Sequence, residues 1–236
     1  MAILVGIDEA GYGPLLGPLV VSSAVFQMPD ELLRADLWEV LHTAVARQKR
    51  GLAGRLLITD SKKAYTRKEG PKHLKRTVHT CLDAAGNASG GRIGTGRQLI
   101  DRLCPVCARR LADYPWYVHL HEHSLIDDSE DLSIAAGVLR RTMADSGIRL
   151  RGLHSRCLDV NFYNTRVEAV KNKSRVLFTE LCALVVEALE SAGSETVQVV
   201  VDRQGGRIHY QQELMRMLPG YGLTVIRQDE KMSSYE

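Results

Sequence analysis

The sequence predicts an α/β protein, with strands and helices in one large domain. Short apolar runs at residues 3–7, 197–201 and 223–226 have the composition of buried strands, and an acidic residue follows each of them. Longer segments between these runs carry apolar residues at helical spacing. The chain has 236 residues, 44% of them hydrophobic, which is enough to bury a substantial core. We therefore expect a sheet flanked by helices.

In chain order, the first half predicts a strand at 3–7, a glycine-bearing turn and a second strand at 19–26 that pairs back on the first. Helical spacing continues over 30–50 and 68–82, with a brief apolar run at 56–58 between them. The polar, glycine-rich stretch at 84–97 has no periodicity and predicts a loop.

The second half begins with alternation at 117–123, which predicts a strand carrying His119, His121 and His123 on one face. The remaining predictions are a helix at 131–144 capped by Asp128 or Ser129, a strand at 148–158, one long helix at 162–189, a strand at 197–201, a helix at 207–218 and a last strand at 223–226.

Charge and cysteine content restrict the class of protein only slightly. A net charge of +3 permits nucleic-acid binding without arguing for it, so the position of the basic residues matters more than their number. We expect neither a secretory leader nor a membrane helix. Five cysteines, an odd number, do not suggest a disulfide framework. A cytoplasmic protein is the default expectation.

The acids at the strand ends are the strongest functional signal. Adjacent carboxylates such as Asp8 and Glu9 repel each other and resist burial, and a divalent cation relieves both costs. The alternative is a turn with incidental acids. If the three acid-terminated strands are parallel and adjacent, their carboxyl ends meet at one edge of the sheet. We then expect a single site formed by Asp8, Glu9, Asp202 and Asp229.

Oxygen ligands of this kind favour Mg²⁺ or Mn²⁺ over zinc. Two such ions about 4 Å apart activate a water molecule and stabilise the leaving oxygen of a phosphodiester. The acids therefore suggest phosphodiester hydrolysis.

Residues 6–20, GIDEAGYGPLLGPLV, resemble the opening signature of type 2 ribonuclease H (ribonuclease HII) over about fifteen positions. A second point of resemblance is Asp-Ser-Lys-Lys at 60–63. The resemblance implies a ribonuclease-H-like mixed sheet flanked by helices. Residues 84–147 do not resemble the family, and because they make this region longer than the family pattern, we expect them to form an inserted subdomain. It also implies a metal-dependent endonuclease that cuts the RNA strand of RNA–DNA hybrids, or at ribonucleotides within DNA.

The resemblance also assigns site residues. It matches Asp8, Glu9 and Asp202 to the family's first three acids, and Asp229 to its fourth, with Glu230 as a competitor for that role. It implies that the backbone of Gly11, Tyr12 and Gly13 contacts the nucleic acid, and that Ser61, Lys62 and Lys63 contact phosphate. A separate basic cluster, suggested by composition alone, consists of Lys171, Lys173 and Arg175.

Departures from the family pattern leave alternatives open. Tyr12 stands where the family has arginine, and Arg203 follows Asp202 where it has glycine. A divergent nucleic-acid-binding relative with weak or no catalysis is one alternative, and a nuclease of the same fold acting on DNA junctions is another. Residues 233–236 resemble the first turn of a helix that the family places beside its active site. Because the given sequence stops there, we expect slow cleavage with little preference for a single ribonucleotide. The oligomeric state stays open.

Cys104 and Cys107 form a Cys-x-x-Cys pair that, with the histidines at 119–123, could hold a structural zinc ion. The missing second pair and the irregular histidine spacing argue against this site. We expect free thiols and less than one equivalent of zinc.

Overall fold

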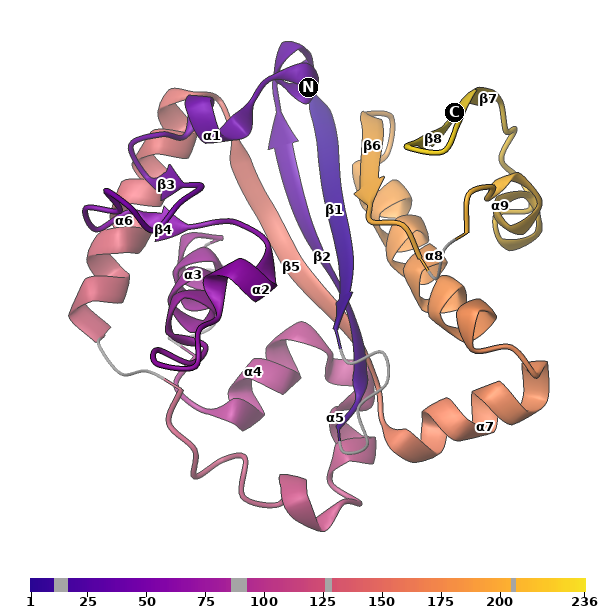
Figure 1. Ribbon diagram of the computed structural model, residues 1–236, viewed down its shortest axis with the longest axis horizontal. Coiled ribbons are helices and arrows are strands. Elements are labelled where there is room, and N and C mark those ends of the chain that lie inside the picture. The colour runs from indigo at the N-terminus through magenta and orange to yellow at the C-terminus, as the bar shows by residue number, and fades with distance from the viewer. Residues whose placement is uncertain (11–16, 86–92, 126–128, 205–206) are drawn as a thin grey trace.

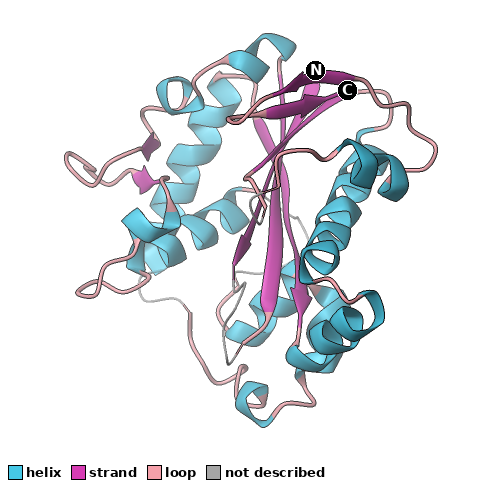
Figure 2. Ribbon diagram, turned by 45° about the vertical axis from the view of Figure 1, so that its right-hand side comes forward, coloured by secondary structure: helices cyan, strands magenta, loops and turns pink. Residues whose placement is uncertain are grey.

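The computed structural model describes residues 1–10, 17–85, 93–125, 129–204 and 207–236 (Figure 1). Its central sheet has the strand order β5-β2-β1-β6. The strands are β1 (Ala2–Ala10), β2 (Leu19–Met28), β5 (Arg149–Leu158) and β6 (Thr196–Val201). β2 is antiparallel to both β1 and β5, whereas β6 is parallel to β1. The predicted α/β class, with an open mixed sheet between helices, is confirmed (Figure 2).

One face of the sheet packs against α8 (Lys173–Ala192). Alternation along β1 places Ile3, Val5 and Ile7 on this face, and each is at most 4% exposed. On the helix, the buried side chains include Leu177, Leu181 and Leu184. This core holds β1 and β6 beside each other.

The other face carries a second core, covered by α3 (Lys72–Ala84) and α6 (Ser129–Asp145). The two helices are joined by a bidentate ion pair, in which Arg76 Nε and Nη2 lie 2.6 and 2.9 Å from the carboxylate oxygens of Asp131. Two short strands, β3 (Val45–Ala46) and β4 (Leu56–Leu57), add a small parallel sheet beside them. The helices predicted near 68–82 and 131–144 are confirmed, with shifted ends; the proposed cap Asp128 lies outside the described residues.

The predicted helix at 30–50 is wrong. The segment contains a 3-10 helix, η1 (Asp30–Arg34), a single helical turn, α1 (Leu37–Val40), and strand β3. Asp36 starts the new turn by accepting a hydrogen bond from the Trp38 amide. The apolar residues of this segment are buried in the second core, so their spacing reflects packing rather than a continuous helix.

Within the region predicted as an insertion, the structure has α4 (Gly96–Leu103), α5 (Pro105–Leu111) and the 3-10 turn η2 (Pro115–Tyr117). The strand predicted at 117–123 is wrong, because these residues form turns after η2. Pro115 favours the turn, and the rings of Tyr114, Trp116 and Tyr117 pack on one another with centroids 5.2–6.1 Å apart. α4 and α5 both contact β5.

The single long helix predicted at 162–189 is divided into α7 (Val160–Val170) and α8. Lys171 adopts a left-handed conformation with φ of 52°, which ends α7. Asn172 then caps α8 by accepting a hydrogen bond from the Arg175 amide at 3.1 Å. A turn therefore interrupts an apolar pattern that reads as continuous.

The C-terminal segment holds α9 (Gln211–Met217), β7 (Val225–Gln228) and β8 (Ser233–Tyr235). β7 pairs with β8 in a separate two-stranded sheet, so the condition that all three acid-terminated strands lie parallel and adjacent is not met. Residues 233–236, expected as a helical turn, include β8 instead. In the described residues, no helix combines the length and the apolar character that crossing a membrane would need.

Candidate active site

Asp8 and Asp202 lie at matching positions on neighbouring parallel strands. Ile7 of β1 is in register with Val201 of β6, and an aspartate follows each of these two residues. Both aspartates are exposed, while the residues before them are wholly or partly buried. Asp8 lies within β1 rather than after it, because the strand continues to Ala10. Parallel pairing of the first and the 197–201 strands, as predicted, brings these two acids together.

Glu9 shares the electrostatic field of these two aspartates. Its pKa is raised above the ordinary value of 4.5, first because burial opposes the charged form and then because Asp8 and Asp202 repel the carboxylate. Asp8 and Asp202 each accept a hydrogen bond from the following backbone amide, at 2.8 and 2.7 Å. The end of the β1–β6 pair therefore carries three mutually repelling carboxylates, a concentration of negative charge that suits a cation.

Gln204 is a member of this site that the sequence analysis missed. It is 2% exposed, and its side-chain amide partly offsets the rise in the pKa of Glu9. Neither Nε2 nor Oε1 has a hydrogen-bond partner of standard geometry among the described residues. Leaving a buried polar group unpaired costs about 1–3 kcal/mol, so a polar ligand beside Glu9 would be favoured. The available signal was its position two residues after a strand-ending acid.

Asp229 is not brought to this edge by strand pairing. Its carboxylate accepts hydrogen bonds from the amides of Lys231 and Met232, at 2.8 and 2.9 Å, and pairs with Arg227. These contacts lower its pKa. The guanidinium of Arg203 donates to the carbonyl of Glu230, so the turn at 229–232 is tethered near the end of β6.

The residues fit a divalent cation in part. Asp8, Glu9 and Asp202 supply oxygen donors in a repulsive field, and Gln204 adds an unpaired amide beside them. As arranged, however, no three acidic, histidine or cysteine side chains in the described part of the chain gather closely enough to hold one ion. Asp229 does not fit as a fourth ligand here, because its oxygens are engaged within its own turn.

The predicted nucleic-acid contacts lie on several elements. Ser61, Lys62 and Lys63 open α2 (Ser61–Ala64), where Asp60 caps the turn, and all three are exposed. The α7–α8 corner exposes Lys171, Lys173 and Arg175. Nε of Arg175 lies 3.6 Å from Oε1 of Glu213. α2 contacts α3 on one side of the sheet, whereas α8 covers the other. Gly11, Tyr12 and Gly13 lie outside the described residues.

The histidines considered for zinc do not join the cysteine pair. His119, His121 and His123 are exposed, and His119 Nδ1 lies 3.0 Å from the Glu122 carboxylate. Cys104 and Cys107 are buried, at the N-cap and in the first turn of α5. No described group of three such ligands could hold a metal ion, and a turn stands in place of the strand that was expected to align the histidines.

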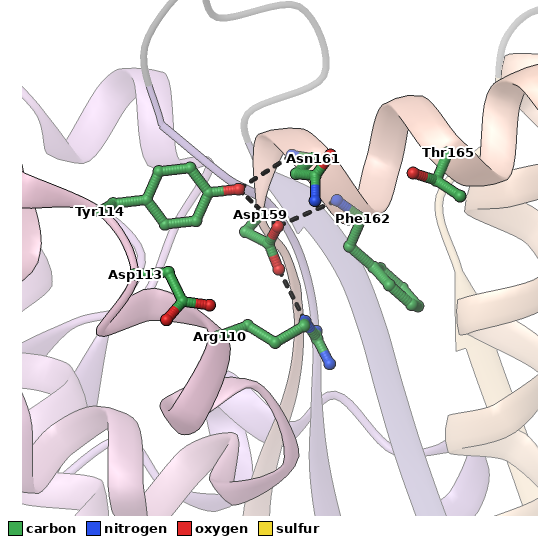
Figure 3. Close-up of a pocket in the computed structure, with 7 residues that line it drawn as sticks. All are labelled: Arg110, Asp113, Tyr114, Asp159, Asn161, Phe162 and Thr165. Carbon is green, nitrogen blue, oxygen red and sulfur yellow. Dashed lines mark hydrogen bonds and ion pairs between the residues drawn. The ribbon is translucent and has the colours of Figure 1, made fainter.

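A cavity of about 340 Å³ lies away from these acids, between α5 and the start of α7 (Figure 3). Asp159, which is 3% exposed, accepts hydrogen bonds from the Phe162 amide, the Tyr114 hydroxyl and Arg110 Nε, at 2.7–2.9 Å. The Tyr114 hydroxyl also accepts from the Asn161 amide. These contacts cap α7 and attach it to α5, so we interpret this network as structural.

Comparison with known proteins adds no assignment, since no family model, curated protein or solved structure matches the chain. A proposal about function therefore starts from the geometry of the acids and from the short sequence resemblance.

Proposed function

We propose that this chain is a metal-dependent endonuclease with a ribonuclease-H-like fold. Its substrate would be the RNA strand of RNA–DNA hybrids, or ribonucleotides within DNA. The observation that carries the proposal is the register of β1 and β6, which places Asp8 beside Asp202 where the pairing of these two parallel strands ends. The resemblance of residues 6–20 and 60–63 to ribonuclease HII supplies the reaction class.

In this proposal, Asp8, Glu9 and Asp202 hold Mg²⁺ or Mn²⁺. When bound, two such ions activate water and stabilise the leaving oxygen of the phosphodiester. Glu9 contributes charge that burial and its two neighbours make unfavourable without a cation. Lys62 and Lys63 bind the phosphate backbone and hold the strand in place.

One observation favours a second candidate, a nucleic-acid-binding relative with weak or no catalysis. Asp229 is engaged by Arg227 and two backbone amides, and its turn is tethered by Arg203. A site limited to three acids would position ions less well than one with four. Small displacements of reacting groups cost large factors in rate.

The test is cleavage of a labelled RNA–DNA hybrid in Mg²⁺ or Mn²⁺ by the parent chain, Asp8→Asn and Asp202→Asn. We expect each variant to lose at least about a hundredfold in rate, equivalent to about 2.7 kcal/mol of transition-state stabilisation. Asp101→Asn is the matched control, because Asp101 forms a surface ion pair with Arg97. Parent-rate cleavage by either site variant would contradict the assignment.

The same assay separates the alternatives. A parent chain that binds the hybrid but does not cleave it supports the second candidate. Cleavage of branched DNA in preference to the hybrid would instead support a nuclease acting on DNA junctions.

A further inference from the structure

Three cysteine thiols meet in one buried cluster, away from the candidate active site. Cys104 precedes α5, Cys107 lies in its first turn and Cys157 lies near the end of β5. They are 7%, 2% and 6% exposed and share a small apolar core with Leu111. The packing of α5 on β5 therefore brings together thiols that are far apart in the sequence.

The three thiols interact directly. Hydrogen bonds from Cys104 first and Cys157 second lower the pKa of Cys107 to about 4, and the nearby Arg110 contributes to the shift. The hydrogen bond to Cys107 in turn raises the pKa of Cys104 to about 12. Of the three thiols, Cys107 is therefore the one whose ionisation the cluster favours.

The thiol cluster adjoins a cavity. A second cavity, of about 210 Å³, is lined in part by Ile100, Leu111 and Tyr117. The same three residues belong to or pack against the thiol core. The cavity and the thiol core therefore share these side chains.

We propose that Cys104, Cys107 and Cys157 form a thiol-oxidation site, in which hydrogen peroxide oxidises Cys107 and a disulfide then forms with Cys104. The Cys107 sulfur attacks one peroxide oxygen, the O–O bond breaks, and the hydroxide released takes up a proton to leave as water. The Cys104 sulfur then attacks the sulfenic acid sulfur. The S–O bond breaks, and its hydroxyl leaves with the Cys104 proton as a second water.

The choice of Cys104 as partner follows from local geometry. Cys104 and Cys107 are three residues apart at the start of a helix, and the Cys107 thiol donates a hydrogen bond of 3.2 Å from Sγ to the Cys104 carbonyl oxygen. Cys157, on the neighbouring strand, is hydrogen-bonded to both thiols and is the alternative disulfide partner of Cys107. Cys81 and Cys182 provide internal controls, because burial raises their pKa values to about 11 and about 12.

The test treats the full chain with hydrogen peroxide, blocks the remaining thiols by alkylation and analyses tryptic peptides by mass spectrometry. Cleavage after Arg102 and Arg109 leaves Cys104 and Cys107 in one peptide, while Cys157 falls in another. We expect peptide 103–109 to become lighter by two hydrogens and to resist alkylation. Its oxidation should be at least about tenfold faster than that of Cys81 or Cys182.

Cys107→Ser should abolish the oxidation of Cys104, whereas Cys157→Ser should leave the 103–109 disulfide intact. Full alkylation of peptide 103–109 in the peroxide-treated parent chain would overturn the proposal without requiring any variant to fold. A disulfide joining Cys157 to peptide 103–109 as the main product would overturn the choice of Cys104.

Discussion

Glu9 is the residue whose titration reports most directly on the acidic site. Its pKa in the folded chain lies above the ordinary 4.5, because of burial and then of repulsion by Asp8 and Asp202. Protonated Glu9 is therefore favoured in the folded state. Its contribution to stability is fully present below pH 4.5 and is lost as the pH rises through the folded pKa. At neutral pH the ionised group opposes folding.

We predict that Glu9→Gln raises the free energy of unfolding at pH 7 and changes it little at pH 4. Solvent screening should keep the gain below about 1 kcal/mol, because Glu9 is only partly buried. Mn²⁺ should raise the Tm of the parent chain more than that of the variant, since ligands that bind only the folded state stabilise it.

Thermal unfolding followed by circular dichroism, with and without Mn²⁺, measures both effects. Glu31→Gln is a suitable control, because Glu31 is exposed in η1. A Glu9 variant that is no more stable than the parent at pH 7, with an unchanged response to Mn²⁺, would show that the acids do not form a shared cation site.

Among the elements, the junction of α5 with α7 depends on one buried carboxylate. Burial opposes the ionisation of Asp159, but hydrogen bonds from the Phe162 amide, Arg110 and Tyr114 outweigh it and lower its pKa below 3.8. This contribution to stability is present above pH 3.8 and is lost as the pH falls through the lower folded value. The junction should therefore weaken in strong acid.

We predict that Asp159→Asn destabilises the chain by about 1–3 kcal/mol at pH 7, because it removes a buried, multiply hydrogen-bonded charge. The difference from the parent should shrink near pH 3. Urea unfolding at the two pH values measures it. Asp113→Asn, at the exposed rim of the same cavity, should change stability little. Equal loss in both variants would contradict the capping role of Asp159.

At the scale of the whole molecule, exposed basic groups lie on two sides of the central sheet. Lys62 and Lys63 belong to α2, beside α3, whereas Lys171 and Lys173 belong to the α7–α8 corner. A duplex bound at the end of the β1–β6 pair would contact both pairs of lysines only if it extended from one side of the sheet to the other. Salt dependence of binding can count such contacts.

We predict that Lys62→Ala/Lys63→Ala weakens binding of an RNA–DNA hybrid and reduces the slope of log K against log salt by about 1–2, whatever the sequence. Lys171→Ala/Lys173→Ala should act similarly if the duplex spans the edge. Fluorescence anisotropy in 50–200 mM salt, concentrations over which phosphate contacts change affinity by about 10³ or more, is the measurement.

The matched control is Arg34→Ala/Arg149→Ala, which removes the same charge at the opposite end of the sheet. Arg34 ends η1, and Arg149 begins β5, in register with Gln27 of β2. If this control reduces the slope as much as the α2 variant does, binding is nonspecific and α2 is not a phosphate contact.

The sequence alone determined the elements whose patterns are local. Short apolar runs predicted β1, β2, β5 and β6, and helical spacing predicted α3 and α6, because these patterns lie in neighbouring residues. It also predicted that parallel pairing of β1 with β6 brings Asp8 and Asp202 together, although β1 continues past Asp8 to Ala10. That prediction needed only the apolar runs and the acids that follow them.

The tertiary structure decided what depends on contacts between distant segments. Asp229 accepts hydrogen bonds from the amides of its own turn. β7 pairs with β8 and therefore does not carry this acid to the central sheet. Gln204 and Cys157 become notable only when packing buries one beside Glu9 and the other beside α5. Composition and spacing indicate which side chains are buried. The partner of a polar group is set by the folded chain, because the free energy of burying that group depends on whether a hydrogen-bond partner lies beside it.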